Sequence, residues 1–188
     1  MKKILVSWLD LNRDFAAKTD KNPCDNSPNY HMHRFFYRHQ KWDRHLLLYR
    51  AAGFEDHARG FAARVERDFK GQHPVEIRLV PVDDPINLEA ILSRTEEVLL
   101  GLRGWQIDIF STPGVQGMQM AFFFCHISMN LNTRLLQVRK REYTPTGLPE
   151  LEEIKTRRSR EAYSLMLERR QTGGDRSPAD AMDFCRFG

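Results

Sequence analysis

A short polar turn, Ser111-Thr112-Pro113-Gly114, interrupts the apolar stretch QIDIFSTPGVQGMQMAFFF of residues 106–124. The hydroxyls of such a turn donate hydrogen bonds, and its glycine lets a ligand approach the backbone closely. If a helix follows the turn, the start of that helix adds free N–H groups and a partial positive charge. Together these groups suit a phosphate or a ribose. The alternative is a plain turn between strand and helix, and the spacing alone favours neither.

The segments around this turn predict a parallel α/β sheet. Residues 4–8 are apolar without alternation, as in a strand that is buried on both faces. Strands that alternate with helices of ordinary length form βαβ units. We therefore expect a Rossmann-like parallel sheet flanked by helices. Its other elements are predicted to be strands at 75–82, 105–110 and 134–139 and helices at 84–102 and 115–129.

Other segments give less regular patterns. The apolar residues of 41–70 lie near helical spacing, so we predict a helix there, and the aromatic segment 33–39 is predicted to be a short strand. Residues 10–30 are rich in Asn, Asp, Pro and Ser and predict a long loop. The expected organisation is a sheet domain at 1–144, a charged helix within 145–172, with its pattern at 149–171, and a linker or tail at 173–188.

Length and composition describe one globular domain. The chain has 188 residues, of which 41% are hydrophobic and 29% charged, and its formal net charge of +4 is a mild bias toward anionic partners. Three cysteines, Cys24, Cys125 and Cys185, are too few and odd in number for a disulfide scaffold, which favours the reducing cytoplasm. No segment approaches ~20 apolar residues, so we expect no membrane partner.

Two groups of residues carry weaker indications. The densest group of metal-ligand types is His31, His33, His39 and His45, but its spacing matches no common zinc site. We expect these histidines to lie on loop and strand surfaces and expect no metal or other cofactor. The arginines of 149–171 are predicted to face solvent, and we expect no direct DNA binding by this segment.

The candidate site lies where predicted strands end. In an open parallel sheet, ligands bind beyond the carboxyl ends of the strands, where neighbouring crossovers diverge. Two basic residues end the last predicted strand, and arginine matches phosphate oxygens well, although a solvated charge run is the alternative. We predict no catalytic residue. The predicted ligand-binding residues are Ser7, Trp8, Asp10, Ser111, Thr112, Pro113, Gly114, Gln116, Gly117, Met118, Arg139 and Lys140.

The order strand, STPGVQGMQ, helix and then NTRLLQVRKRE resembles the second signature segment of CARF domains (CRISPR-associated Rossmann fold). In particular it resembles the sensor domain at the N-terminus of the RNA-repair transcriptional activators. In that family a strand ends in a Thr/Ser-Gly-Thr type turn, and a later strand has Ala-Arg-Leu-Ile-Gln character. Here Pro113-Gly114 stands in place of Gly-Thr, and residues 133–137 read TRLLQ. The segments VPVDDPINLEAI and RHQKWDRHLLLY extend the resemblance over residues 1 to about 142.

The resemblance implies a homodimeric sensor. Two CARF domains pair so that their strand-end loops form one pocket, which binds a cyclic oligoadenylate or a nucleotide derived from an RNA end. In the RNA-repair regulators the sensor controls an ATPase that acts on an alternative-sigma-factor polymerase. The sequence contains no Gly-x-x-x-x-Gly-Lys-Ser/Thr motif, so we do not expect that ATPase within it. Two alternatives stay open: a ring nuclease that cleaves the cyclic oligoadenylate, and a ligand-free oligomerisation module.

Overall fold

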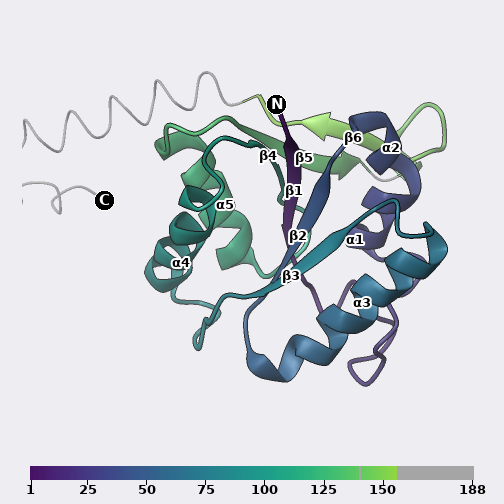
Figure 1. Cartoon of the computed structure of the whole chain (residues 1–188), viewed down its shortest axis with the longest axis horizontal. Coiled ribbons are helices and arrows are strands. Elements are labelled where there is room, and N and C mark those ends of the chain that lie inside the picture. The colour runs from purple at the N-terminus through teal and green to yellow at the C-terminus, as the bar shows by residue number, and fades with distance from the viewer. Residues whose placement is uncertain (140, 156–188) are drawn as a thin grey trace, which may run out of the picture. The chain divides into compact units, whose positions relative to one another are not determined.

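The computed structural model describes residues 1–139 and 141–155, and these contain a six-stranded sheet with helices on both faces (Figure 1). The strand order is β3-β2-β1-β4-β5-β6, and all neighbours are parallel except β5 and β6. The strands are β1 (Lys3–Trp8), β2 (Arg44–Tyr49), β3 (Val75–Leu79), β4 (Gln106–Phe110), β5 (Thr133–Arg139) and β6 (Glu150–Glu153).

Two groups of helices cover the sheet. Helices α4 and α5 pack side by side on one face, and α1, α2 and α3 lie on the other (Figure 1). The helical segments are α1 (Pro28–His31), the π-helix η1 (Met32–Phe36), α2 (Tyr37–Gln40), the 3-10 helix η2 (Ala52–Phe54), α3 (Glu55–Asp68), α4 (Leu88–Leu100), α5 (Gln116–Ser128) and the 3-10 helix η3 (Arg141–Tyr143).

Strand β1 is apolar without alternation because both of its faces are covered. Ile4, Val6 and Trp8 belong to the hydrophobic cluster under α4 and α5. Leu5 points to the other face and packs in a cluster with Met32 of η1. All four side chains are buried. The predicted Rossmann-like sheet and its first strand are confirmed.

The predicted helix over 41–70 is wrong in its first part. Residues 44–49 form β2, between β1 and β3, and only Glu55–Asp68 is α-helical. The reason is the apolar run of β2: Leu46 and Leu48 pack toward α4 and α5, whereas Leu47 packs on the opposite face. A run that is buried on both faces suits an inner strand better than an amphipathic helix.

The predicted strand over 33–39 is also wrong, because this segment is helical in η1 and α2. Its His33 and Tyr37 rings stack with centroids 5.0 Å apart, one helical turn from each other. The helix predicted over 84–102 is present, but the observed helix α4 is shorter at both ends. It begins at Leu88, after Asn87, whose side chain accepts from the Ala90 amide as the N-cap.

The predicted charged helix is corrected at its start. Residues 150–153 form β6, which pairs antiparallel with β5 in the register Leu136↔Glu153 to Arg139↔Glu150. This pairing satisfies backbone groups that an open edge of β5 would leave without partners. The rest of that predicted helix, from residue 156, and the predicted tail 173–188 lie outside the described residues. In the part of the chain that the structure describes, no helix has the length and apolar character of a membrane span.

Candidate functional site

The sheet has one topological switch point, between β1 and β4. The chain leaves β1 toward β2 on one side and leaves β4 toward β5 on the other. The loops that follow these two strands, residues 9–27 and 111–115, therefore begin at the same carboxyl edge. This is the place where open α/β sheets bind ligands.

The two loops are tied together by a pair of contacts that we call the Asp10–Arg13 clasp. Asp10 Oδ2 accepts a hydrogen bond from the Gly114 amide at 3.2 Å. Arg13 Nη1 donates to the Thr112 carbonyl oxygen at 2.9 Å. Arg13 Nε lies 3.9 Å from the same Asp10 oxygen. The clasp joins residues about a hundred positions apart in the sequence.

A buried carboxylate organises the long loop behind the clasp. Asp14 is fully buried and accepts hydrogen bonds from the Asp10 amide at 2.9 Å, Ser27 Oγ at 2.5 Å and Asn29 Nδ2 at 2.7 Å. Burial raises the pKa of Asp14 to about 6, and these donors oppose the rise. Because every partner donates, the site is built for the ionised carboxylate. The predicted loop 10–30 is thus ordered around one acidic group.

The turn after β4 requires its glycine. Gly114 has φ 93°, and a Cβ there would lie 3.1 Å from Trp8 Cβ and 3.3 Å from Met118 Cβ. Gln119 Nε2 donates to the carbonyl oxygens of Thr112 and Gly114, both at 3.0 Å. A side chain near the start of α5 thus stabilises the loop that precedes this helix.

A cavity of about 330 Å³ opens beside this turn, between α5 and β5. Four of its lining side chains are apolar, and the others carry hydroxyl, amide or guanidinium groups. Among the described residues that line it, Arg13 is the one cation. The lining residues are Arg13, Ser111, Thr112, Gln119, Phe123, Leu135, Gln137, Val138 and Ile154.

The predicted site residues divide into two groups. Ser111 and Thr112 line the cavity, Asp10 and Gly114 form part of the clasp, and Gln116 and Gly117 begin α5 beside them. The structure keeps the side chains of four further predicted residues away from the cavity lining. Trp8 packs against Phe122 with ring centroids 6.2 Å apart. The predicted residues whose side chains are buried, and so offer no surface to a ligand, are Ser7, Trp8, Pro113 and Met118.

The basic residue at the end of β5 has a partner within the sheet. Arg139 lies at the carboxyl edge, but its Nη2 donates to Glu152 Oε1 of β6 at 2.9 Å. Lys140 lies outside the described residues. Arg13, which the sequence reasoning missed, is the arginine at the rim. Its only sequence signal was membership of a long loop directly after the first strand.

Two of the four clustered histidines are core residues, so the prediction that they lie on surfaces is wrong for them. His33 and His45 are buried, and His33 Nε2 lies 2.9 Å from His45 Nδ1. His45 Nε2 lies 2.8 Å from Ser7 Oγ, and that hydroxyl donates to Asn29 Oδ1. Because the Ser7 hydroxyl proton is donated to Asn29, Ser7 Oγ must accept the hydrogen bond from His45 Nε2. Burial lowers the pKa of His45 to about 3 and keeps both rings neutral.

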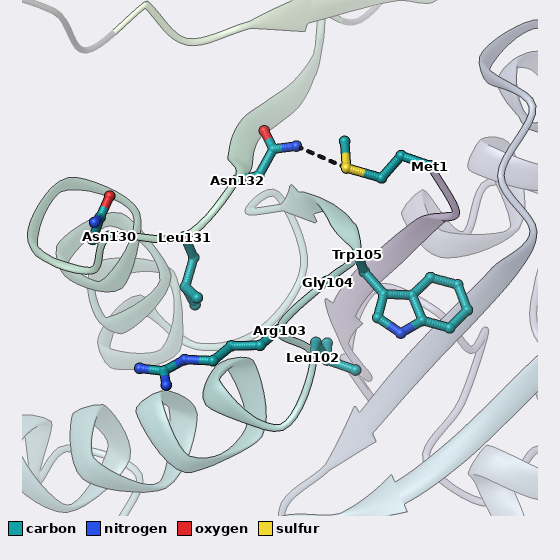
Figure 2. A pocket seen from close by; sticks show the side chains of 8 residues that line it. All are labelled: Met1, Leu102, Arg103, Gly104, Trp105, Asn130, Leu131 and Asn132. Carbon is teal, nitrogen blue, oxygen red and sulfur yellow. Dashed lines mark hydrogen bonds between the residues drawn. The ribbon is translucent and has the colours of Figure 1, made fainter.

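A larger hollow, of about 410 Å³, lies at the opposite edge of the sheet (Figure 2). It is formed by the connections from α4 to β4 and from α5 to β5. Figure 2 shows Asn132 reaching the Met1 sulfur, with Trp105 and Arg103 extending in different directions. This hollow lies at the amino ends of the strands, so we place the candidate site in the cavity at the carboxyl edge.

The chain is similar to known proteins in structure, whereas its sequence matches no family model and no curated protein. The structure of Enterococcus italicus Csm6 bound to cyclic hexa-2'-fluoro-hexa-dAMP is similar, with a TM-score of 0.64 and 14% identity over 92% of this chain and 46% of that chain. The two structures share an α/β fold.

A second similar structure is protein VC1899 from Vibrio cholerae, with a TM-score of 0.51 and 12% identity. The match covers 82% of this chain and 36% of VC1899. The chain thus spans less than half the length of either structure. Identities this low establish the likeness of the fold alone.

Proposed function

We propose that this chain is a sensor domain that binds a cyclic oligoadenylate at the carboxyl edge of its sheet. The observation that carries the proposal is the convergence of the loops after β1 and β4 beside a polar-rimmed cavity. The shared α/β fold supports it, because the similar Csm6 structure holds a cyclic hexanucleotide analogue. The resemblance of the turn Ser111–Gly114 to the CARF signature supports it independently.

The chemistry of the cavity suits one nucleotide unit. Its volume of about 330 Å³ lies at the small end of ligand pockets, which range over roughly 300–1,000 Å³. The Arg13 guanidinium suits a phosphate oxygen. Gln119 Nε2 already donates to the Thr112 and Gly114 carbonyl oxygens and Gln137 Nε2 to Glu152, so these side chains offer mainly their acceptor oxygens to a base edge. Phe123, which is half-buried, supplies apolar surface on which a base packs.

A whole cyclic oligonucleotide exceeds this single cavity. We therefore propose that two copies of the chain pair and share the ring across a two-fold axis, each taking part of it. Following the resemblance to the RNA-repair activators, we also propose that the bound state controls an output of the alternative-sigma-factor type. The dimer and the output are both parts of the proposal.

The test is to incubate the purified chain with cyclic oligoadenylates of several ring sizes and to measure both its melting temperature and the fate of the ring by chromatography. A sensor raises the melting temperature and leaves the ring intact. At a ligand concentration 100 times Kd the added stability is about 2.7 kcal/mol. Linear products identify a ring nuclease instead. No shift with any ring contradicts the proposal and favours the ligand-free oligomerisation module.

A further inference from the structure

The Gly114 amide, in the turn beside the candidate cavity, already has an anionic partner. The Asp10 side chain is only 11% exposed, and its Oδ2 accepts from the Gly114 amide at 3.2 Å. Its Oδ1 accepts from the Asn12 amide at 3.0 Å. The Gly114 amide belongs to the turn directly before α5. A ligand phosphate that approaches this turn therefore meets a carboxylate in place.

The Arg13 guanidinium lies close to the same oxygen atom, Asp10 Oδ2. Arg13 Nε lies 3.9 Å from Asp10 Oδ2, and its Nη1 is engaged by the Thr112 carbonyl oxygen. An amide N–H and a guanidinium are the two donors that proteins most often offer to phosphate oxygens. Here both converge on one carboxylate oxygen, so a carboxylate occupies the geometry of a phosphate site.

The segment that carries Asp10 is fixed at both ends. On one side the Leu9 amide donates to the Leu48 carbonyl oxygen at 2.7 Å, as a continuation of β1. On the other side Asp14 is buried and held by Ser27 and Asn29. Residues 10–13 form a short bridge between these anchors. The Asp10 backbone is itself held by Asp14: its amide donates to Asp14 Oδ2 at 2.9 Å, and its carbonyl oxygen accepts from the Asp14 amide at 2.7 Å. A change in the Asp10 contact is therefore confined to the Asp10 and Arg13 side chains and leaves the backbone of the loop in place.

We propose that the Asp10 carboxylate is an internal competitor for the ligand phosphate, and that binding requires Asp10 to leave Gly114 and Arg13. This inference rests on the proposed function, since it concerns the same site. One anion replaces another, so the cost of binding includes the loss of the Asp10 contacts. The exchange also converts ligand binding into a movement of the Asp10 and Arg13 side chains, which is a conformational change that an output could detect.

The alternative is that Asp10 is a tie that holds the turn in a binding-competent shape. The two accounts give opposite signs for Asp10→Asn. An internal competitor loses its charge in this variant, so ligand affinity rises, by about tenfold or more if one charge-assisted contact is relieved. A tie that is weakened leaves affinity equal or lower. Asp83→Asn is the matched control, because it removes an exposed charge at the same edge without a contact to Gly114.

The experiment uses the full chain and follows the Gly114 amide resonance by ¹H–¹⁵N NMR during titration with cyclic hexa-adenylate and, separately, with inorganic pyrophosphate. We expect Asp10→Asn to bind at least one probe about tenfold more tightly than the wild type. We expect Asp83→Asn to stay within about threefold of it. Asp10→Ser, which also removes the charge, replaces Asp10→Asn if the latter does not give a folded spectrum.

The outcomes separate the two proposals. If Asp10→Asn binds neither probe more tightly than the wild type does, the competitor inference is overturned, whether or not the wild type binds the cyclic nucleotide. If pyrophosphate binds the variant more tightly but the cyclic nucleotide binds neither protein, the inference stands and the proposed ligand is wrong. An equal gain in affinity in Asp83→Asn would show that the gain comes from the change in net charge at this edge, and it would also overturn the inference.

Discussion

The guanidinium of Arg139 lies 2.9 Å from the carboxylate of Glu152 on the neighbouring strand, and the two side chains are 45% and 41% exposed. Arg139, at the end of β5, therefore forms an ion pair with a residue of β6. Arg13, 54% exposed, stands at the rim of the cavity, 3.9 Å from Asp10. The positive charge that is best placed for a ligand thus comes from the loop after β1.

This difference predicts unequal effects of two arginine substitutions. Arg13→Gln should weaken binding of cyclic hexa-adenylate by about 10- to 150-fold, because one charge-assisted contact is worth roughly 1.5–3 kcal/mol. Arg139→Gln should weaken it by less than about fivefold, since its charge is engaged by Glu152. Calorimetry at two salt concentrations measures both, with Arg103→Gln at the opposite edge as control. Equal losses in Arg13→Gln and Arg139→Gln would contradict this assignment.

The turn after β4 predicts a stability effect at Gly114. Gly114→Ala should lower the free energy of unfolding by roughly 1–3 kcal/mol, because φ is 93° and the new Cβ lies 3.1 Å from Trp8 Cβ. Gly53→Ala is the control, since a Cβ there meets nothing within 4 Å and no positive φ is involved. Urea denaturation gives both values. If the two variants unfold alike, the strain argument fails.

A buried ion pair links β5, β4 and the segment before β2. Asp108 is fully buried and accepts from Trp42 Nε1 at 2.7 Å and from Arg134 Nε at 2.8 Å. Arg134→Ala should cost about 3–5 kcal/mol of unfolding free energy, because it leaves a buried charge without its cation. Arg44→Ala breaks the exposed pair with Glu76 and should cost under about 1 kcal/mol. A loss at Arg134 no larger than that at Arg44 would show that the Asp108 charge is hydrated or neutral.

Buried histidines predict that stability falls in acid. Burial lowers the pKa of His45 to about 3, and those of His33 and His73 also lie below their ordinary value. The unfolded chain binds protons at these residues below about pH 6.5, whereas the folded chain does not. His45 therefore removes up to about 1.4 kcal/mol of stability per pH unit as the pH falls from about 6.5 toward 3, and His33 and His73 act in the same direction.

Asp14 acts in the opposite direction, because its pKa of about 6 exceeds the ordinary value and the folded chain binds its proton first between about pH 6 and 4. The three histidines outnumber this one carboxylate, so we expect the free energy of unfolding to fall as the pH is lowered below 6. Denaturation at several pH values measures the slope. His45→Gln should reduce it by about 1.4 kcal/mol per pH unit, and the exposed His39→Gln should leave it unchanged. An unchanged slope in His45→Gln would mean that His45 is not buried as a neutral ring.

The elements that sequence reasoning predicted are those with one clear pattern. Strand β1 and helix α5 are mainly apolar, and polar or turn residues separate each of them from the neighbouring elements. Both lie close to their predicted bounds. Strand β2 was missed because LLLY merges with the apolar spacing of the following helix. Strand β6 has the sequence ELEE, which has no strand preference, and it forms because β5 presents an open edge.

The candidate site was predictable only in part. The turn 111–114 carries its own signal, since Pro, Gly and hydroxyl residues separate two apolar elements. The role of Arg13 depends on a contact with Thr112, 99 positions away, which no local pattern reveals. Burial of Ser7, Trp8 and Met118 follows from the packing of α5 and α1 on the sheet, so residues adjacent in sequence to the site fell outside it.

The central proposal is that the carboxyl edge of this parallel sheet binds a cyclic oligoadenylate. Isothermal titration of the full chain with cyclic hexa-adenylate tests it most directly. We predict saturable binding with one ring per two chains, and a marked loss of affinity in Arg13→Gln but not in Arg103→Gln. The absence of saturable binding with any ring size, or binding that Arg13→Gln leaves unchanged, would contradict the claim.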